Sequence, residues 1–231
     1  MKTLKTWASG IAMVALTGAA QAALVNRGGG MIYDTTRNIT WLADMNYAGT
    51  SVHTGLGVNA NGTMTWVAAH DWAINLVYGG FSDWRLPTLN PSDTSCSDNF
   101  TPFGFPTQYF GFNCTGGELS GLFVTDLGNK ANESVLNQVG DTAEQIANLA
   151  LFSNVQSNFY WSGTEYAPDR LSTWYFRTQN GYQHFFDVAL AFYAVAVRPG
   201  DVAARVPEPQ TLALALLALG ATVVARRRRP A

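Results

Sequence analysis

The sequence is poor in cysteine and histidine, and it lacks the common catalytic motifs. Among its 231 residues only two are cysteines and three are histidines. It contains no Gly-x-Ser-x-Gly, no His-Glu-x-x-His and no Gly-x-x-x-x-Gly-Lys segment. His53, His70 and His184 are scattered without the spacing of metal ligands. We therefore expect a protein that is not an enzyme and holds neither a metal nor a cofactor.

Positive charge is also scarce once the two ends of the chain are set aside. Six of the 14 Lys and Arg residues lie at the ends, at Lys2, Lys5 and residues 226–229, whereas all 16 acids lie between Asp34 and Glu208. The middle therefore has 8 cations against 16 acids, a net charge of about −8. An acidic domain repels polyanions, so nucleic acid is not an expected partner. The charge does not exclude neutral glycans, or acidic glycans bridged by cations, as partners.

The first 22 residues have the layout of a secretory signal peptide. Two lysines precede an apolar stretch from Trp7 to Ala20, and the small residues Ala20 and Ala22 place the signal peptidase cut before Ala23. The apolar stretch is too short to span a hydrocarbon layer of ~30 Å, which needs roughly 20 residues. The alternative of a permanent N-terminal anchor is therefore disfavoured.

The C-terminal end carries three features in a fixed order. Pro207, Glu208 and Pro209 form a stiff, non-helical break, and an apolar run favouring helix follows at 211–225. The run ends in a cationic cluster that stays on the cytoplasmic side of a membrane, formed by Arg226, Arg227, Arg228 and Arg229.

This order resembles the PEP-CTERM sorting signal over residues 206–231. The resemblance implies processing by an exosortase near the Pro-Glu-Pro segment, with the apolar run, a transmembrane helix, held transiently in the inner membrane. It further implies delivery to the cell surface, the outer membrane or the extracellular matrix of bacteria that make exopolysaccharide.

Residues 23–203 lie between the two ends and suffice for one domain with a buried core. Because an exported protein passes through an oxidising compartment, Cys96 and Cys114 are expected to form a disulfide. It would close a loop of about 19 residues and contribute about 3 kcal/mol.

The pattern of the middle predicts strands, then a helix, then loops and helices, then several strands. A hairpin is expected at 31–33 and 39–42, and a loop at 47–62. Thr65 caps a helix that the Gly79-Gly80 pair ends, and Asn180-Gly181 marks a later hairpin turn. Further helical stretches are expected at 118–127 and 143–152, and further strands at 159–161, 174–178, 182–187 and 193–198. This is an α+β fold with a mainly antiparallel sheet and two or three helices.

Five segments together resemble the Lcl C-terminal domain family of bacterial surface proteins. They are Gly30–Asp34 with Asn38–Trp41, the helix after Thr65, Asp83–Thr88, Tyr160–Thr164 and Ala194–Arg198. The resemblance spans 24–202 and implies a C-type-lectin-like fold, similar to that of the formylglycine-generating enzyme, but a fold does not carry a function with it. The chain departs from the family pattern at Glu118-Leu119, which follows the leucine-proline-threonine segment only after the insertion that holds both cysteines.

The residues of these segments also have a purely structural interpretation. Arg85 is expected to stack on an indole or to pair with an acid such as Asp83. Five tryptophans are expected to pack in the core: Trp41, Trp72, Trp84, Trp161 and Trp174.

Aromatic and polar residues on loops are the candidates for ligand binding, because recognition residues are often on loops of a rigid scaffold. They are Phe103, Phe105, Tyr109, Tyr166, Asp169 and Arg170. The alternative is that the aromatics only fill a small core beneath the loop.

Three functions follow from these observations. The first is a non-catalytic surface or biofilm-matrix protein that binds or organises exopolysaccharide. The second is an enzyme acting on glycans or proteins through paired acids such as Asp83 and Glu165. The third is a structural matrix protein without a specific ligand.

Overall fold

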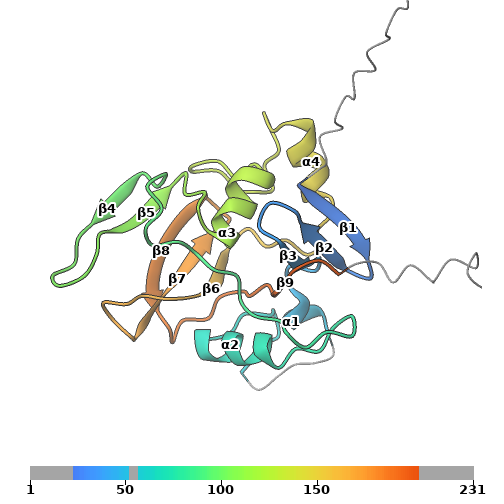
Figure 1. The fold of residues 1–231 in the computed structure, drawn as a ribbon, viewed down its shortest axis with the longest axis horizontal. Helices are drawn as coiled ribbons and strands as arrows, with labels where there is room; N and C mark the ends of the chain where they lie inside the picture. The colour runs from blue at the N-terminus through green and yellow to red at the C-terminus, as the bar shows by residue number, and fades with distance from the viewer. Residues whose placement is uncertain (1–22, 52–56, 203–231) are drawn as a thin grey trace, which may run out of the picture.

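The computed structural model describes residues 23–51 and 57–202. The expected signal peptide at 1–22, His53, and the sorting tail with its apolar run and arginines lie outside the described residues. In the part described, two antiparallel sheets and several short helices form one α+β domain, which confirms the predicted fold class (Figure 1). No helix of these residues is both long and apolar enough to cross a membrane.

The smaller sheet is built around the predicted N-terminal hairpin. Its strands run in the order β1 (Leu24–Gly28), β2 (Met31–Asp34), β3 (Ile39–Leu42) and β9 (Val197–Pro199). The prediction missed β1, and the expected last strand is shorter because Tyr193 forms only an isolated bridge and residues 194–196 form none.

The larger sheet has the order β4 (Asp98–Phe100), β5 (Gln108–Phe112), β8 (Tyr182–Asp187), β7 (Ser172–Arg177) and β6 (Phe159–Glu165). The three strands β6 to β8 confirm the predicted ones: β8 has the predicted bounds, β6 runs four residues further, and β7 begins two residues earlier and ends one residue earlier. The β4–β5 hairpin, which we call the arm, was expected to be irregular. It projects from the body on the side opposite β1, so the stapled insertion extends the sheet (Figure 1).

Four helices and a π-helix connect the sheets in the described ranges: α1 (Tyr47–Thr50), α2 (Trp66–Ile74), α3 (Glu118–Ser120), η1 (Gly121–Asp126) and α4 (Ala143–Leu149). The predicted cap of α2 is confirmed, because the Thr65 hydroxyl accepts a hydrogen bond from the Ala68 amide at 3.4 Å. The helix ends at Ile74, before the glycine pair. Helix α1 lies where only a loop was expected.

The turn between β7 and β8 corrects a prediction. The predicted hairpin is present, but Arg177 pairs directly with Tyr182, so its loop has four residues, 178–181, instead of the three residues 179–181 between the expected strands. Of the Asn-Gly pair only Gly181 has a positive φ, 71°, and a Cβ on it would come within 2.8 Å of the Lys130 carbonyl oxygen. Close packing against the Lys130 backbone therefore requires glycine at position 181 of this turn.

Most of the expected core tryptophans are buried. Trp41, Trp161 and Trp174 are fully buried and Trp84 is 2% exposed, whereas Trp72 is half-buried between two apolar clusters. All three apolar clusters draw their buried residues from 24–197, so this stretch carries a core of its own.

Arg85 has a different partner from the one expected. Its guanidinium donates two hydrogen bonds to the Glu118 carboxylate, both at 2.7 Å, and the Thr88 amide donates to the same carboxylate at 2.8 Å. Burial alone would raise the pKa of Glu118, but these donors outweigh it and hold the pKa below its ordinary value. Asp83 is bound instead by Arg198, at 2.8 and 3.0 Å. Two long-range ion pairs thus fix the segment that contains Arg85.

Candidate functional site

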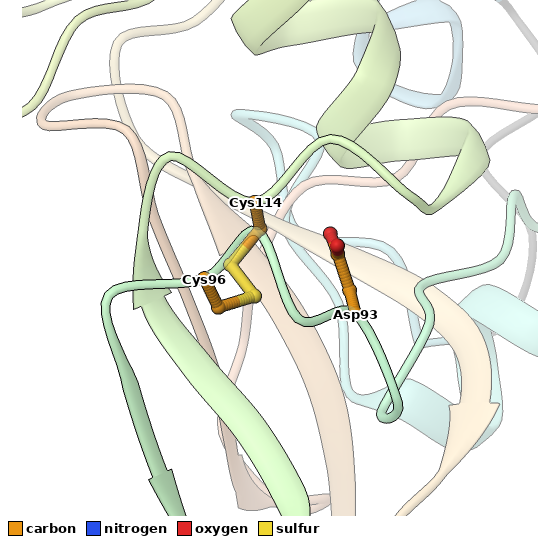
Figure 2. A group of neighbouring side chains, drawn as sticks. All are labelled: Asp93, Cys96 and Cys114. Carbon is orange, nitrogen blue, oxygen red and sulfur yellow. A yellow bond between two sulfur atoms is a disulfide. The ribbon is translucent and has the colours of Figure 1, made fainter.

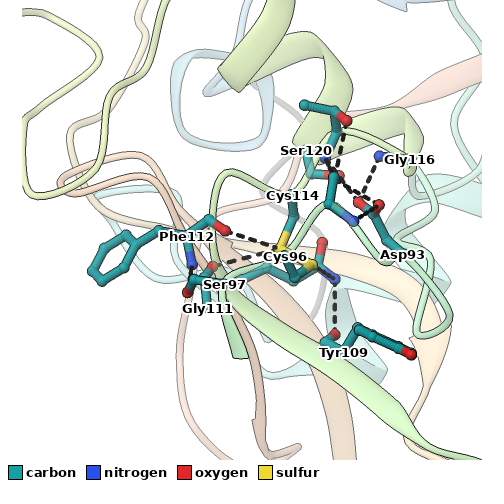
Figure 3. The surroundings of a disulfide bond; sticks show 12 residues. Asp93, Cys96, Ser97, Tyr109, Gly111, Phe112, Cys114, Gly116 and Ser120 are labelled. Carbon is teal, nitrogen blue, oxygen red and sulfur yellow. Dashed lines mark hydrogen bonds between the residues drawn. A yellow bond between two sulfur atoms is a disulfide. The ribbon is translucent and has the colours of Figure 1, made fainter. Parts of the chain in front are cut away.

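The base of the arm is held by a disulfide and by one buried carboxylate. Cys96 and Cys114 are bonded, and the Asp93 side chain lies beside them (Figure 2). Asp93 accepts hydrogen bonds from the Ser95 amide and hydroxyl at 3.0 and 2.6 Å, and from the Thr115 and Gly116 amides at 2.8 and 2.6 Å (Figure 3). Burial opposes the charge, but these donors leave the pKa of Asp93 below its ordinary value.

The same three side chains are close enough to be compared with a metal site. One ligand atom of each of Asp93, Cys96 and Cys114 lies within 4.8 Å of the others. Metal binding by cysteine uses the thiolate, and a disulfide offers none. Four donors also occupy the carboxylate. The arrangement is therefore a structural clamp that ties the arm to the domain.

The strand register places four side chains side by side across the larger sheet. Phe159 pairs with Arg177, Arg177 with Tyr182, and Tyr182 with Phe112. Directly paired residues point to the same face, and three strand spacings cover about 14 Å. All four side chains are half-buried. We call these four, together with His184 and Phe110, the aromatic row.

Four rings of the row touch one another in a continuous series, and Phe159 joins them only through Arg177. The centroids of Phe112 and Tyr182 are 4.8 Å apart, those of Tyr182 and His184 are 5.8 Å apart, and those of His184 and Phe110 are 5.0 Å apart. Burial, and then the nearby Asp98 carboxylate, raise the pKa of Tyr182, so its hydroxyl stays neutral and able to donate at physiological pH. The row is a rigid, partly open aromatic surface bearing one arginine.

The expected loop candidates do not form one site with this row. Phe103 and Phe105 lie at the tip of the arm and are 103% and 40% exposed, so neither fills a small core. Tyr109 is half-buried, its amide donates to the Pro91 carbonyl at 2.8 Å, and its carbonyl accepts from the Gln183 side chain at 3.5 Å. The register places it on the face opposite Phe110 and Phe112.

The candidates of the β6–β7 loop also have local structural roles. Tyr166 is only 6% exposed and stacks on Phe185 at a centroid distance of 3.7 Å, so its ring packs in the core instead of lying open on a loop, and its expected role in ligand binding stays a prediction. Asp169 accepts hydrogen bonds from the Leu171 amide and the Ser172 hydroxyl, which closes the loop. Arg170 is exposed beside it.

The aromatic row was not predicted, because the candidate binding residues were aromatic and polar residues expected on loops. The alternating aromatics of Gln108–Phe112 and Tyr182–Phe186 could have indicated it, since side chains two apart share one face of a strand. The order β5-β8-β7-β6, which joins these strands, is a tertiary property that the sequence pattern does not contain.

A polar pocket of about 270 Å³ lies elsewhere, between η1 and α4. Its lining residues are Thr125, Asp126, Thr142, Glu144, Gln145 and Asn148. The Asp126 carboxylate there is bound by Arg37 at 2.6 Å, and Arg37 also binds Asp34 at 2.6 Å. This network connects the π-helix to the β2–β3 hairpin, which gives Asp126 a structural role.

Of the two acids proposed for an enzyme, one is held in an ion pair and the other is exposed. The Asp83 carboxylate is bound at both oxygens by Arg198, and the Arg198 guanidinium lies 4.0 Å from the Phe81 ring centroid. Arg198 holds the pKa of Asp83 below its ordinary value. Glu165 is exposed at the end of β6. A carboxylate engaged in this way is poorly suited to accept or deliver a proton.

Comparison with known proteins adds one match. Residues 205–229 match the PEP-CTERM protein-sorting motif, which confirms the predicted sorting signal. The motif implies that the protein is exported, recognised by an exosortase and associated with the cell surface. Neither a curated protein nor a solved structure matches the chain.

Proposed function

We propose that this exported protein binds or organises exopolysaccharide at the cell surface or in the extracellular matrix, without catalysis, through the aromatic row. The observation that carries the proposal is the row itself, a half-exposed series of rings fixed by strand register on the larger sheet. Sugar rings bind to such faces because the flat apolar side of a pyranose packs on an aromatic ring. Rings held by a sheet need little ordering when a ligand binds.

The sorting motif supports the same proposal from a separate part of the chain. The motif implies delivery to the cell surface, and exopolysaccharide at that surface is the ligand of this proposal. The proposal has four further parts. The domain belongs to the Lcl C-terminal domain family and has a C-type-lectin-like fold. Signal peptidase cuts before Ala23, and residues 211–225 stay transiently in the inner membrane. The net charge of about −8 disfavours a nucleic acid partner.

The test is affinity electrophoresis of residues 23–205, produced in an oxidising compartment, through gels that contain the polysaccharide of the producing cells. We expect retardation of the wild type. Tyr182→Ala and Phe112→Ala should each weaken binding about tenfold, the ordinary cost of truncating a contact residue.

Two further variants locate the surface. Tyr33→Ala removes a half-buried ring from the smaller sheet and should leave retardation unchanged. Phe103→Ala removes the fully exposed ring at the arm tip, and a loss confined to this variant would move the site from the row to the tip. An unretarded wild type would favour the structural matrix protein instead.

A further inference from the structure

Most positive side chains of the described ranges already have an acidic partner. These ranges contain seven Lys and Arg residues, and five of them form salt bridges with Asp or Glu: Arg27, Arg37, Arg85, Lys130 and Arg198. Arg170 and Arg177 form none with any described residue. The domain has about twice as many acidic as basic residues, so two arginines without an acidic partner among the described residues are candidates for binding a ligand.

Arg177 is placed within the aromatic row. Its guanidinium carbon lies 4.5 Å from the centroid of the Phe159 ring and 5.9 Å from that of Tyr182. Its Nε is buried and has no hydrogen-bond partner in the part of the chain that the structure describes. The two rings hold the planar guanidinium in place, so its two terminal NH2 groups, and not the buried Nε, are preorganised as a fork of donors on the row.

We propose that the row binds an acidic polysaccharide and that Arg177 binds the carboxylate of a uronic acid residue whose ring packs beside Tyr182. This inference rests on the proposed function and names its ligand class. A guanidinium fork matches the two oxygens of a carboxylate, and the bonds are charge-assisted and therefore stronger than those to a hydroxyl. Neutral sugars could use the rings but would leave the Arg177 donors unmatched.

Arg170 provides the matched control. It is likewise without an acidic partner among the described residues, but it lies on the exposed β6–β7 loop, seven residues from Arg177, and no described ring lies under its guanidinium. The net charge of about −8 repels an acidic polysaccharide at long range, so its binding must come from a local contact instead of from general attraction. Any nonspecific electrostatic contribution would depend on both arginines alike, because each contributes one unit of charge. A specific carboxylate site depends on Arg177 alone.

The experiment compares two probes by isothermal titration of residues 23–205: oligogalacturonate, and the same oligosaccharide after reduction of its carboxyl groups to neutral alcohols. We expect the wild type to bind oligogalacturonate at least about tenfold more tightly, the effect of one charge-assisted interaction. Arg177→Gln should abolish this preference without changing the affinity for the reduced probe. Arg170→Gln should preserve it.

Arg177→Lys keeps the charge but loses the fork, and we expect it to retain only part of the preference. Thermal unfolding of every variant shows whether it is folded. If Arg177→Gln is not folded, Arg177→Lys is the variant that tests the role of Arg177.

Equal affinity of the wild type for the two probes, or equal losses in the Arg170 and Arg177 variants, would overturn the inference while leaving the proposed function standing. Failure to bind either probe would count against both.

Discussion

The pairing of Arg85 with Glu118 can be tested by replacing the glutamate. Glu118→Ala removes two hydrogen bonds of 2.7 Å to Arg85 and the acceptor of the Thr88 amide. The glutamate side chain is 16% exposed and the arginine side chain 37%, so water recovers part of the loss. Charge-assisted bonds of this kind contribute about 1.5–3 kcal/mol, and we expect a loss of about 2 kcal/mol. For a domain of this size the melting temperature should fall by about 4–8 °C.

The pH dependence follows from the lowered pKa of Glu118. A carboxylate whose folded pKa is depressed contributes stability that is complete above its unfolded pKa and is lost as pH falls through the folded value. The difference in stability between wild type and Glu118→Gln should therefore be constant from pH 7 to about pH 5 and shrink below about pH 4. Circular dichroism melts at several pH values measure it, with the exposed Glu165→Gln as the control.

A double-mutant cycle decides which acid is the partner of Arg85. We expect a coupling free energy of about 1–2 kcal/mol between Arg85→Met and Glu118→Gln, and near zero between Arg85→Met and Asp83→Asn. A larger coupling to Asp83 than to Glu118 would contradict this prediction, because it would restore the pairing expected from the sequence.

Three further outcomes are expected. Replacing Cys96 and Cys114 by serine should cost about 3 kcal/mol in denaturant unfolding and make the arm the first segment cut in limited proteolysis. Asp93→Ala leaves its four donors without their acceptor and should cost about 2–3 kcal/mol in the same assay, with a deficit that disappears in acid because the pKa of Asp93 is lowered in the fold. Replacing the arginines 226–229 by alanine should stop processing at the sorting motif, seen by intact mass as a chain that begins at Ala23 and keeps its tail.

Local patterns in the sequence predicted local structure well. The polar segment between residues 34 and 38 indicated the β2–β3 hairpin, and Thr65 indicated the start of α2. Both depend on contacts between residues a few positions apart. The arm was not predicted because its two strands are short and the segment between them is rich in glycine and proline. The hairpin is stabilised by a disulfide and by pairing with β8, and neither can be read from its local sequence.

Long-range pairing could not be predicted from the same patterns. Arg85 and Glu118 are 33 positions apart, and Arg198 and Asp83 are 115 apart, so the acid nearest in the sequence was the natural but wrong choice. Tyr166 was a binding candidate because it was expected on a loop, but Phe185 from another strand covers its ring.

The aromatic row shows the same limit on the functional side. Each of its strands displays aromatics, but only the register of four strands brings Phe159, Arg177, Tyr182 and Phe112 together. Composition alone indicated an acidic domain, and it gave no reason to single out one of the seven arginines between the two ends of the chain.

The measurement that tests the account most directly is an NMR titration of residues 23–205 with oligogalacturonate, following the aromatic side chains and the arginine Nε–H groups. We predict that the shifts concentrate on Phe112, Tyr182, His184 and the Nε–H of Arg177. Shifts confined to the arm tip or to the pocket around Asp126, or no shifts at saturating ligand, would contradict it.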